Sequence, residues 1–313
     1  MDVQETPPRQ MSGICTACSS ADSISLGRMP SKLDSRFFAQ IHKCRECGST
    51  FTCPMNSPAE LEEFYSAVFS GSVGKILKES SEAKRKMAEV LLLEVRPWLS
   101  TSGRVLDIGA GFGEWLELLH GSGFYDSWYG VEYSSAMANE LRTRCPWATI
   151  TVSSAEQIGS VLQSKNFTLI TLIAVIEHLH DPQKVLQYIS ESLGDGGRAV
   201  IVYPRVDSFV SRVMGRHWHL FSPVAHLTLY SRKGLLESMS RVGLELVASR
   251  RLRHYYDLAY VCSFMTYFFP WTEPVVSRLS RINWIGKIGF RAYTGIDVVV
   301  AKLGDRRTAT IGA

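Results

Sequence analysis

The sequence has little excess charge of either sign. Its 34 Lys and Arg residues stand against 30 Asp and Glu residues, for a net charge of +4. Domains that bind nucleic acid more often have a pI above ~9 with clustered basic residues. We therefore expect no nucleic-acid partner. The sequence is otherwise that of a folded protein, because 45% of its 313 residues are hydrophobic and such a chain can bury a large core.

Long apolar runs are also missing. The longest spans roughly residues 258–271, which is shorter than the about 20 residues of a membrane-spanning helix. The first ten residues, MDVQETPPRQ, contain no apolar segment of the kind found in secretory signals. These absences predict a cytoplasmic location, where thiols stay reduced.

Cysteine is scarce, with seven residues in all, and four of them form two pairs near the N-terminus. In a reducing compartment, paired C-x-x-C turns favour zinc over disulfides. Each turn places two thiolates at adjacent corners of a tetrahedron, and the second turn completes it. We therefore predict a structural zinc ribbon over residues 13–55; a ribbon with unpaired thiols and no metal is the alternative. The predicted ligands are Cys15, Cys18, Cys44 and Cys47.

Composition divides the chain into five segments. Residues 1–12 are a tail, 13–55 the ribbon and 56–100 a helical connector; residues 101–252 form a core, and 253–313 an aromatic-rich lid or insertion with a last strand.

The core alternates short apolar strands with helices, which is typical of an α/β fold with a parallel sheet covered on both faces. Two later strands, 243–250 and 296–302, are expected to add an edge pair. The first five strands are predicted at residues 104–108, 128–132, 149–152, 167–173 and 198–203.

The segment VLDIGAGFG, residues 105–113, is an apolar strand that leads into a glycine-rich turn. Glu132 ends the next strand, where a carboxylate can accept hydrogen bonds from both ribose hydroxyls. A dinucleotide-binding turn would need glycine at Glu114, where a carboxylate would repel a pyrophosphate. No Gly-Lys-Ser/Thr follows for a P-loop. The pattern suits an adenosine compound with an ammonium group and no phosphate, which is S-adenosylmethionine (SAM); a turn that only permits tight packing is the alternative.

On these residues the sequence resembles class I SAM-dependent methyltransferases, in particular the small-molecule branch related to the ubiquinone-biosynthesis O-methyltransferases. The likeness also covers YGVEYSSAMANELR and FTLITLIAVIEHLHDPQKVL. It implies a Rossmann-like seven-stranded sheet whose last strand is antiparallel, beside the small N-terminal zinc ribbon. It further implies a loop around the methionine part, an acid on the ribose, and contacts to the adenine and the methyl-donor pocket. The matching residues are Asp107, Gly109, Gly111, Gly113, Glu132, Tyr133, Ala155, Ile173 and Ala174.

Some relatives of this branch bind a divalent metal through an E-x-x-E-H motif. Here the run is Ala174-Val-Ile-Glu177-His178, so the first ligand position holds alanine. Two remaining ligands make a poor site, and we predict no catalytic metal.

Methyl transfer to oxygen needs a base that removes the hydroxyl proton. Histidine titrates near ~6.5 and suits this role. His178 follows the fourth strand and His226 follows the fifth, so both are expected beyond the carboxyl ends of the sheet, where ligands bind. His217 and His219 are weaker candidates.

The predicted function is methyl transfer to a hydroxyl of a small molecule such as a sugar, polyketide, isoprenoid or lipid-linked intermediate. The aromatic insertion predicts a lid, with contact to a hydrophobic acceptor or a membrane surface as the alternative. Transfer to carbon or nitrogen is a close variant. Two other functions stay open: an rRNA or tRNA base methyltransferase whose ribbon contacts RNA, and a catalytically inactive methyltransferase-like scaffold.

Overall fold

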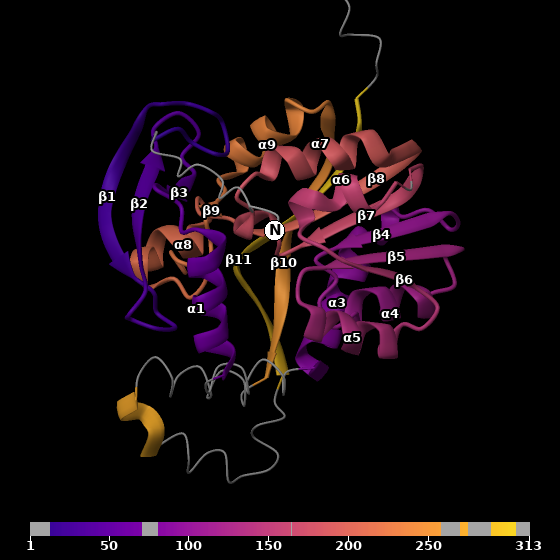
Figure 1. Ribbon diagram of the computed structural model, residues 1–313, viewed down its shortest axis with the longest axis horizontal. Coiled ribbons are helices and arrows are strands. Elements are labelled where there is room, and N and C mark those ends of the chain that lie inside the picture. Colours follow the sequence, from indigo (N-terminus) through magenta and orange to yellow (C-terminus); the bar gives the residue numbers. More distant parts are fainter. Residues whose placement is uncertain (1–12, 71–80, 164, 258–269, 275–288, 305–313) are drawn as a thin grey trace, which may run out of the picture.

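The computed structural model describes residues 13–70, 81–163, 165–257, 270–274 and 289–304. A seven-stranded sheet in the order β10-β11-β8-β7-β4-β5-β6 forms its centre (Figure 1). Strands β4 to β8 run parallel, and β11 lies antiparallel between β8 and β10. This confirms the predicted α/β fold with its antiparallel last strand. The strands are β4 (Arg104–Ile108), β5 (Ser127–Glu132), β6 (Thr149–Val152), β7 (Phe167–Ile173), β8 (Leu193–Pro204), β10 (Leu244–Asp257) and β11 (Gly289–Leu303).

Helices cover both faces of this sheet (Figure 1). Side chains of a strand alternate between its faces, so Leu106 packs with the core on one side and Val105 with the core on the other. One face carries α6 (Ile158–Val161), α7 (Pro182–Ser192) and α9 (Arg232–Ser240); the other carries α3 (Ser81–Val95), α4 (Glu114–Gly121) and α5 (Ser135–Arg144).

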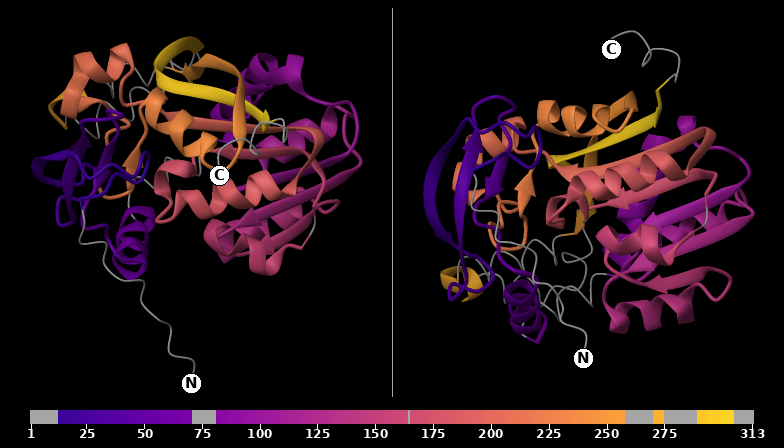
Figure 2. Two further views of the ribbon diagram at one scale, coloured as in Figure 1. Left: turned by 90° about the horizontal axis from the view of Figure 1, so that it is seen from above. Right: turned by 45° about the horizontal axis from the view of Figure 1, so that its top comes forward.

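A second, four-stranded sheet contains the predicted ribbon. Its order is β1 (Ser23–Pro30), β2 (Phe38–Cys44), β3 (Thr50–Thr52) and β9 (Thr228–Leu229). The fourth strand comes from the segment that follows β8, so the ribbon and the core share one sheet and lie side by side in all three views (Figures 1 and 2). Helix α1 (Pro58–Ser70) and the short α8 (Phe209–Met214) pack beside them.

The edge pair is longer than the sequence predicted. Strand β10 continues past residue 250 to Asp257, and β11 begins at Gly289 rather than at 296. The first part of the predicted insertion is therefore strand, and it is stabilised by cross-strand pairs such as Tyr256 opposite Phe290. The tail 1–12 and the insertion residues 258–269 and 275–288 lie outside the described residues. Among the described helices, none has the length and apolarity needed to cross a membrane.

Candidate functional site

The glycine-rich loop joins β4 to α4 and is held by backbone hydrogen bonds to β5. Gly109 N and Ala110 N both donate to Val131 O, at 2.8 and 3.0 Å. Gly109 has a φ of 76° and Gly113 a φ of 88°, in the left-handed region that favours glycine. A Cβ at Gly109 would lie 2.3 Å from the Val175 side chain. The loop thus lies directly against the residues that follow β7.

Glu132 ends β5 and fastens the loop from the other side. Its Oε2 accepts from Gly111 N at 2.9 Å, and its Oε1 accepts from Ser134 N at 2.8 Å. Glu132 is 7% exposed and lies where the parallel strands end. Each carboxylate oxygen can accept more than one hydrogen bond, so lone pairs remain beyond those used by Gly111 and Ser134. Such a carboxylate can still accept from hydroxyls of a ligand.

Asp107 lies one residue before the end of β4 and is 2% exposed. Its Oδ1 accepts a hydrogen bond from Thr171 Oγ1 at 2.6 Å. Burial raises the pKa of its carboxyl to about 7. A cationic group placed beside it would favour the ionised form.

The remaining predicted cofactor residues gather at the same edge. Ser153 N donates to Glu132 O at 3.1 Å, which brings the turn that begins at Ala155 next to the acid. Tyr133 is 65% exposed, so its ring is available to a ligand. Ile173 ends β7, and Ala174 follows it with a φ of 53°. The fold therefore brings together all nine residues that the sequence assigned to the cofactor.

The four paired cysteines form one cluster, with all four sulfurs within 4.8 Å of one another. Cys15 Sγ lies 3.7 Å from Cys47 Sγ, and Cys18 Sγ lies 3.4 Å from Cys44 Sγ. These separations are too long for disulfides, which need about 2.05 Å, and close to the roughly 3.8 Å between thiolates that bind one zinc at ~2.3 Å. Burial raises the pKa of the Cys18 thiol to about 11. The donor set fits a tetrahedral zinc, which would hold the thiolates together.

His178 and His226 lie beside each other, although they come from different segments. Their ring centroids are 4.8 Å apart at an interplanar angle of 73°. His178 Nδ1 donates to Ala225 O, and His226 Nδ1 donates to Leu220 O, both at 2.7 Å. A carbonyl oxygen only accepts, so each neutral ring has its lone pair on Nε2. Burial lowers the pKa of both rings, that of His226 to about 3.

The two weaker histidine candidates do not join this pair in the same way. His217 is exposed. His219 is half-buried beside Trp218, and burial lowers its pKa to about 4.

Two residues of this region were not assigned a role from the sequence. Tyr65, on α1, places its hydroxyl 3.1 Å from His178 Nδ1. Glu177 is 2% exposed, and its Oε2 has no hydrogen-bond partner within the described part of the chain. No spacing in the sequence pairs α1 with the turn after β7, so only the fold could reveal Tyr65. Glu177 stands in a recognisable motif but was set aside because too few ligands accompanied it.

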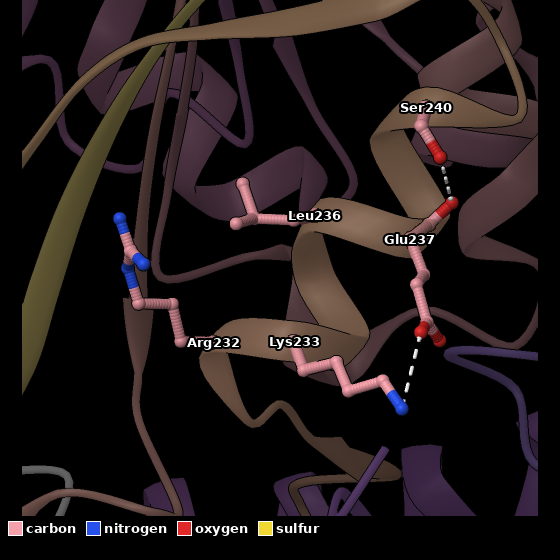
Figure 3. A pocket seen from close by; sticks show the side chains of 5 residues that line it. All are labelled: Arg232, Lys233, Leu236, Glu237 and Ser240. Carbon is pink, nitrogen blue, oxygen red and sulfur yellow. Dashed lines mark hydrogen bonds and ion pairs between the residues drawn. The ribbon is translucent and has the colours of Figure 1, made fainter. Parts of the chain in front are cut away.

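A hollow of about 490 Å³ lies elsewhere, on the outer side of α9 (Figure 3). Three of its polar side chains are bonded within the protein. Lys233 Nζ pairs with Glu237 Oε1 at 3.6 Å and donates to Glu46 O at 2.8 Å, and Ser240 donates to Glu237 O. It lies far along the chain from the glycine loop and offers no group suited to the chemistry described above.

Comparison with known proteins agrees with this geometry. Residues 80–249 match the model of the methyltransferase-domain family. Among curated proteins, none matches the sequence significantly. A chain of the complex between the Haloferax volcanii Trm112 methyltransferase activator and the putative methyltransferase is similar in fold, with a TM-score of 0.51, 14% identity, and coverage of 74% of this chain and 95% of that chain. The structure of a putative methyltransferase from Bacillus halodurans is also similar, with a TM-score of 0.50, 13% identity, and coverage of 70% of this chain and 99% of that chain.

The family match covers more than half of the chain and includes the glycine loop, Glu132 and the turn with Glu177 and His178. The solved structures share the fold at low identity. The chain is therefore a member of the methyltransferase-domain family, built on the seven-stranded sheet of the class I SAM-dependent methyltransferases.

Proposed function

We propose that the protein transfers a methyl group from SAM to a hydroxyl of a small-molecule acceptor such as a sugar, polyketide, isoprenoid or lipid-linked intermediate. One observation carries the proposal: the cofactor loop and the paired histidines meet at a single turn. Val175 packs against Gly109, and His178 follows three residues later, with its N–H bonded to Val175 O at 2.9 Å. A donor on the loop would thus lie near the histidines.

On the donor side, Glu132 would bind the ribose hydroxyls and Tyr133 the adenine face. Asp107 would stabilise the ammonium group, and the backbone of Gly109 and Gly111 would lie along the methionine part. In support, a Cβ at Gly111 would meet, among the described residues, only Met137 Cε at 3.7 Å, so these residues leave room beside the loop.

On the acceptor side, His178 and His226 would orient the hydroxyl and receive its proton at Nε2. The acceptor oxygen then forms a bond to the methyl carbon as the sulfur–carbon bond breaks. The electron pair of the broken bond stays on sulfur, and S-adenosylhomocysteine is the leaving group. The proton leaves to water afterwards. Positioning of two reactants in line supplies most of the rate in such a displacement.

The ribbon would hold zinc and support this acceptor side. Strand β3 pairs with β9, and Thr52 N donates to Leu227 O at 2.9 Å, next to His226. This pairing favours a folding role for the ribbon over contact with RNA, because the edge of β3 is already paired with β9 of the core.

Calorimetry with SAM and a screen of candidate acceptors with labelled SAM test the proposal. We expect SAM binding and labelled product from a hydroxyl compound. The His178→Ala variant should lose about 10²-fold in turnover while its SAM affinity changes less than about 2-fold, and the matched His217→Ala variant should retain full turnover. No SAM binding, or equal turnover in both variants, would contradict the assignment.

A further inference from the structure

One carboxylate oxygen of Glu177, Oε2, has no hydrogen-bond partner among the described residues. The residue lies in the turn after β7 and is 2% exposed, and this oxygen is buried. A buried carboxylate in this position is stable only as the neutral acid or beside a cation. The question is whether neighbouring groups could hold a cation there.

Two neutral imidazoles face the same place. One nitrogen from each of His178 and His226 and one carboxylate oxygen of Glu177 all lie within 4.8 Å of one another. Each Nδ1–H donates to a backbone carbonyl, Ala225 O for one ring and Leu220 O for the other. Such outer hydrogen bonds fix ring orientation and are found around almost all metal-binding histidines.

We propose that Glu177, His178 and His226 form a binding site for a divalent first-row transition-metal cation. Bonds of ~2.0–2.2 Å place donor atoms roughly 3.0–3.5 Å apart, so side chains whose donors now lie within 4.8 Å of one another need to close by less than roughly 2 Å. Two imidazoles and one carboxylate suit cations such as zinc, cobalt or iron, whereas magnesium and calcium prefer oxygen ligands alone. The site is separate from the four-cysteine cluster, whose donors are all sulfur.

From the sequence, this motif offers only two metal donors, Glu177 and His178, because Ala174 occupies the first ligand position. The third donor comes instead from His226, on the segment between β8 and β9. That segment lies against the turn after β7, where His178 Nδ1 donates to Ala225 O, and it continues into β9, which pairs with the ribbon. The cation site therefore depends on chain segments that no short motif contains.

Three protein donors leave coordination positions open for oxygen atoms of a ligand. A cation there would bind the acceptor hydroxyl and lower its pKa, so that the proton is lost to solvent water and the acceptor attacks as an alkoxide. The cation would then take over deprotonation from the two histidines, because it would occupy their Nε2 lone pairs. This part of the inference rests on the proposed function, whereas binding of the cation does not. It also narrows the acceptor to compounds with an oxygen that can coordinate a metal.

The test uses the full chain with its cysteine cluster loaded with zinc, titrated with Co²⁺ alone. We expect one Co²⁺ per chain with the visible spectrum of nitrogen and oxygen ligation and no thiolate charge-transfer bands. The His226→Ala and Glu177→Gln variants should bind Co²⁺ at least ~10-fold more weakly, and the matched His217→Ala variant should bind like the parent protein. Thermal melting and SAM calorimetry show whether each variant is folded.

Three results would overturn the cation site: no Co²⁺ uptake by the parent protein, uptake only with thiolate bands, or equal uptake by the folded His226→Ala variant. Methyl transfer that persists after removal of the non-cysteine metal would overturn its role with the acceptor. Failure of the proposed function looks different, because Co²⁺ would then bind as expected while no acceptor is methylated.

Discussion

The glycine loop and its carboxylate come from residues 107–132, a stretch that folds back on itself. The paired histidines, by contrast, are held by contacts among three separate segments, which are α1, the turn after β7 and residues 220–226. On the donor side, Gly111 N and Glu132 Oε2 are 21 positions apart and directly bonded. On the acceptor side, Tyr65 and His178 are 113 positions apart and also directly bonded. Local order thus forms one half of the site, and tertiary packing forms the other.

The largest effect is expected on SAM affinity, from a substitution in the donor half. In Glu132→Ala, the loop loses the acceptor for Gly111 N and the ligand loses its ribose contact. We expect SAM affinity to fall by at least ~100-fold, since charge-assisted hydrogen bonds are each worth about 1.5–3 kcal/mol. Calorimetry measures this, and the matched Glu140→Ala, at an exposed position of α5, should bind SAM normally. Unchanged affinity would remove Glu132 from the site.

A second substitution, in the ribbon, should lower turnover without lowering SAM affinity, and so tests whether the acceptor half depends on the ribbon while the donor half does not. Cys47→Ala removes one sulfur of the cluster, which should release the zinc and loosen β3 from β9. Because His226 lies beside that junction, turnover should fall by ~10-fold or more while SAM affinity stays within about 2-fold. Zinc content, turnover and SAM affinity are measured on the same preparation. The control is Cys53→Ala, a buried cysteine outside the cluster, which should keep its zinc; loss of SAM binding in Cys47→Ala would show that the halves are not independent.

These expectations rest on how unequally the sequence predicted the two halves. The donor side could be predicted residue by residue because glycines, a strand-end acid and a short loop form a local pattern. His178 and His226 were chosen one at a time from their places after strands, but nothing in the sequence showed that they meet or that Glu177 lies with them. The shared sheet of ribbon and core was missed for the same reason, since the two residues of β9 carry no strand pattern of their own.

The smallest effect is expected on the pH dependence of stability, from a substitution at Asp107. The Asp107 carboxyl has a pKa of about 7 in the folded protein and near 3.9 when unfolded. The folded state holds this proton more tightly, so the carboxyl lowers stability progressively as pH rises from about 4 to about 7. At pH 8, Asp107→Asn should therefore be more stable by on the order of 1 kcal/mol or more, yet bind SAM more weakly.

Thermal melts at pH 5 and pH 8 test this, with Asp195→Asn at an exposed position as the control. The stabilisation should appear at pH 8 and shrink toward pH 5. A variant that is equally stable at both values, or that binds SAM as the parent does, would argue that Asp107 is a packing residue only.

The pairing of β9 with β3 has a practical consequence for anyone who shortens this protein. A chain that begins at residue 80, where the family match begins, would lose the ribbon and leave Thr228 and Leu229 as a bare strand edge. It would also uncover the apolar cluster around Trp218 and Leu227, which now packs against α1 and β2. Such a fragment would be prone to aggregate even though it contains every residue of the donor half.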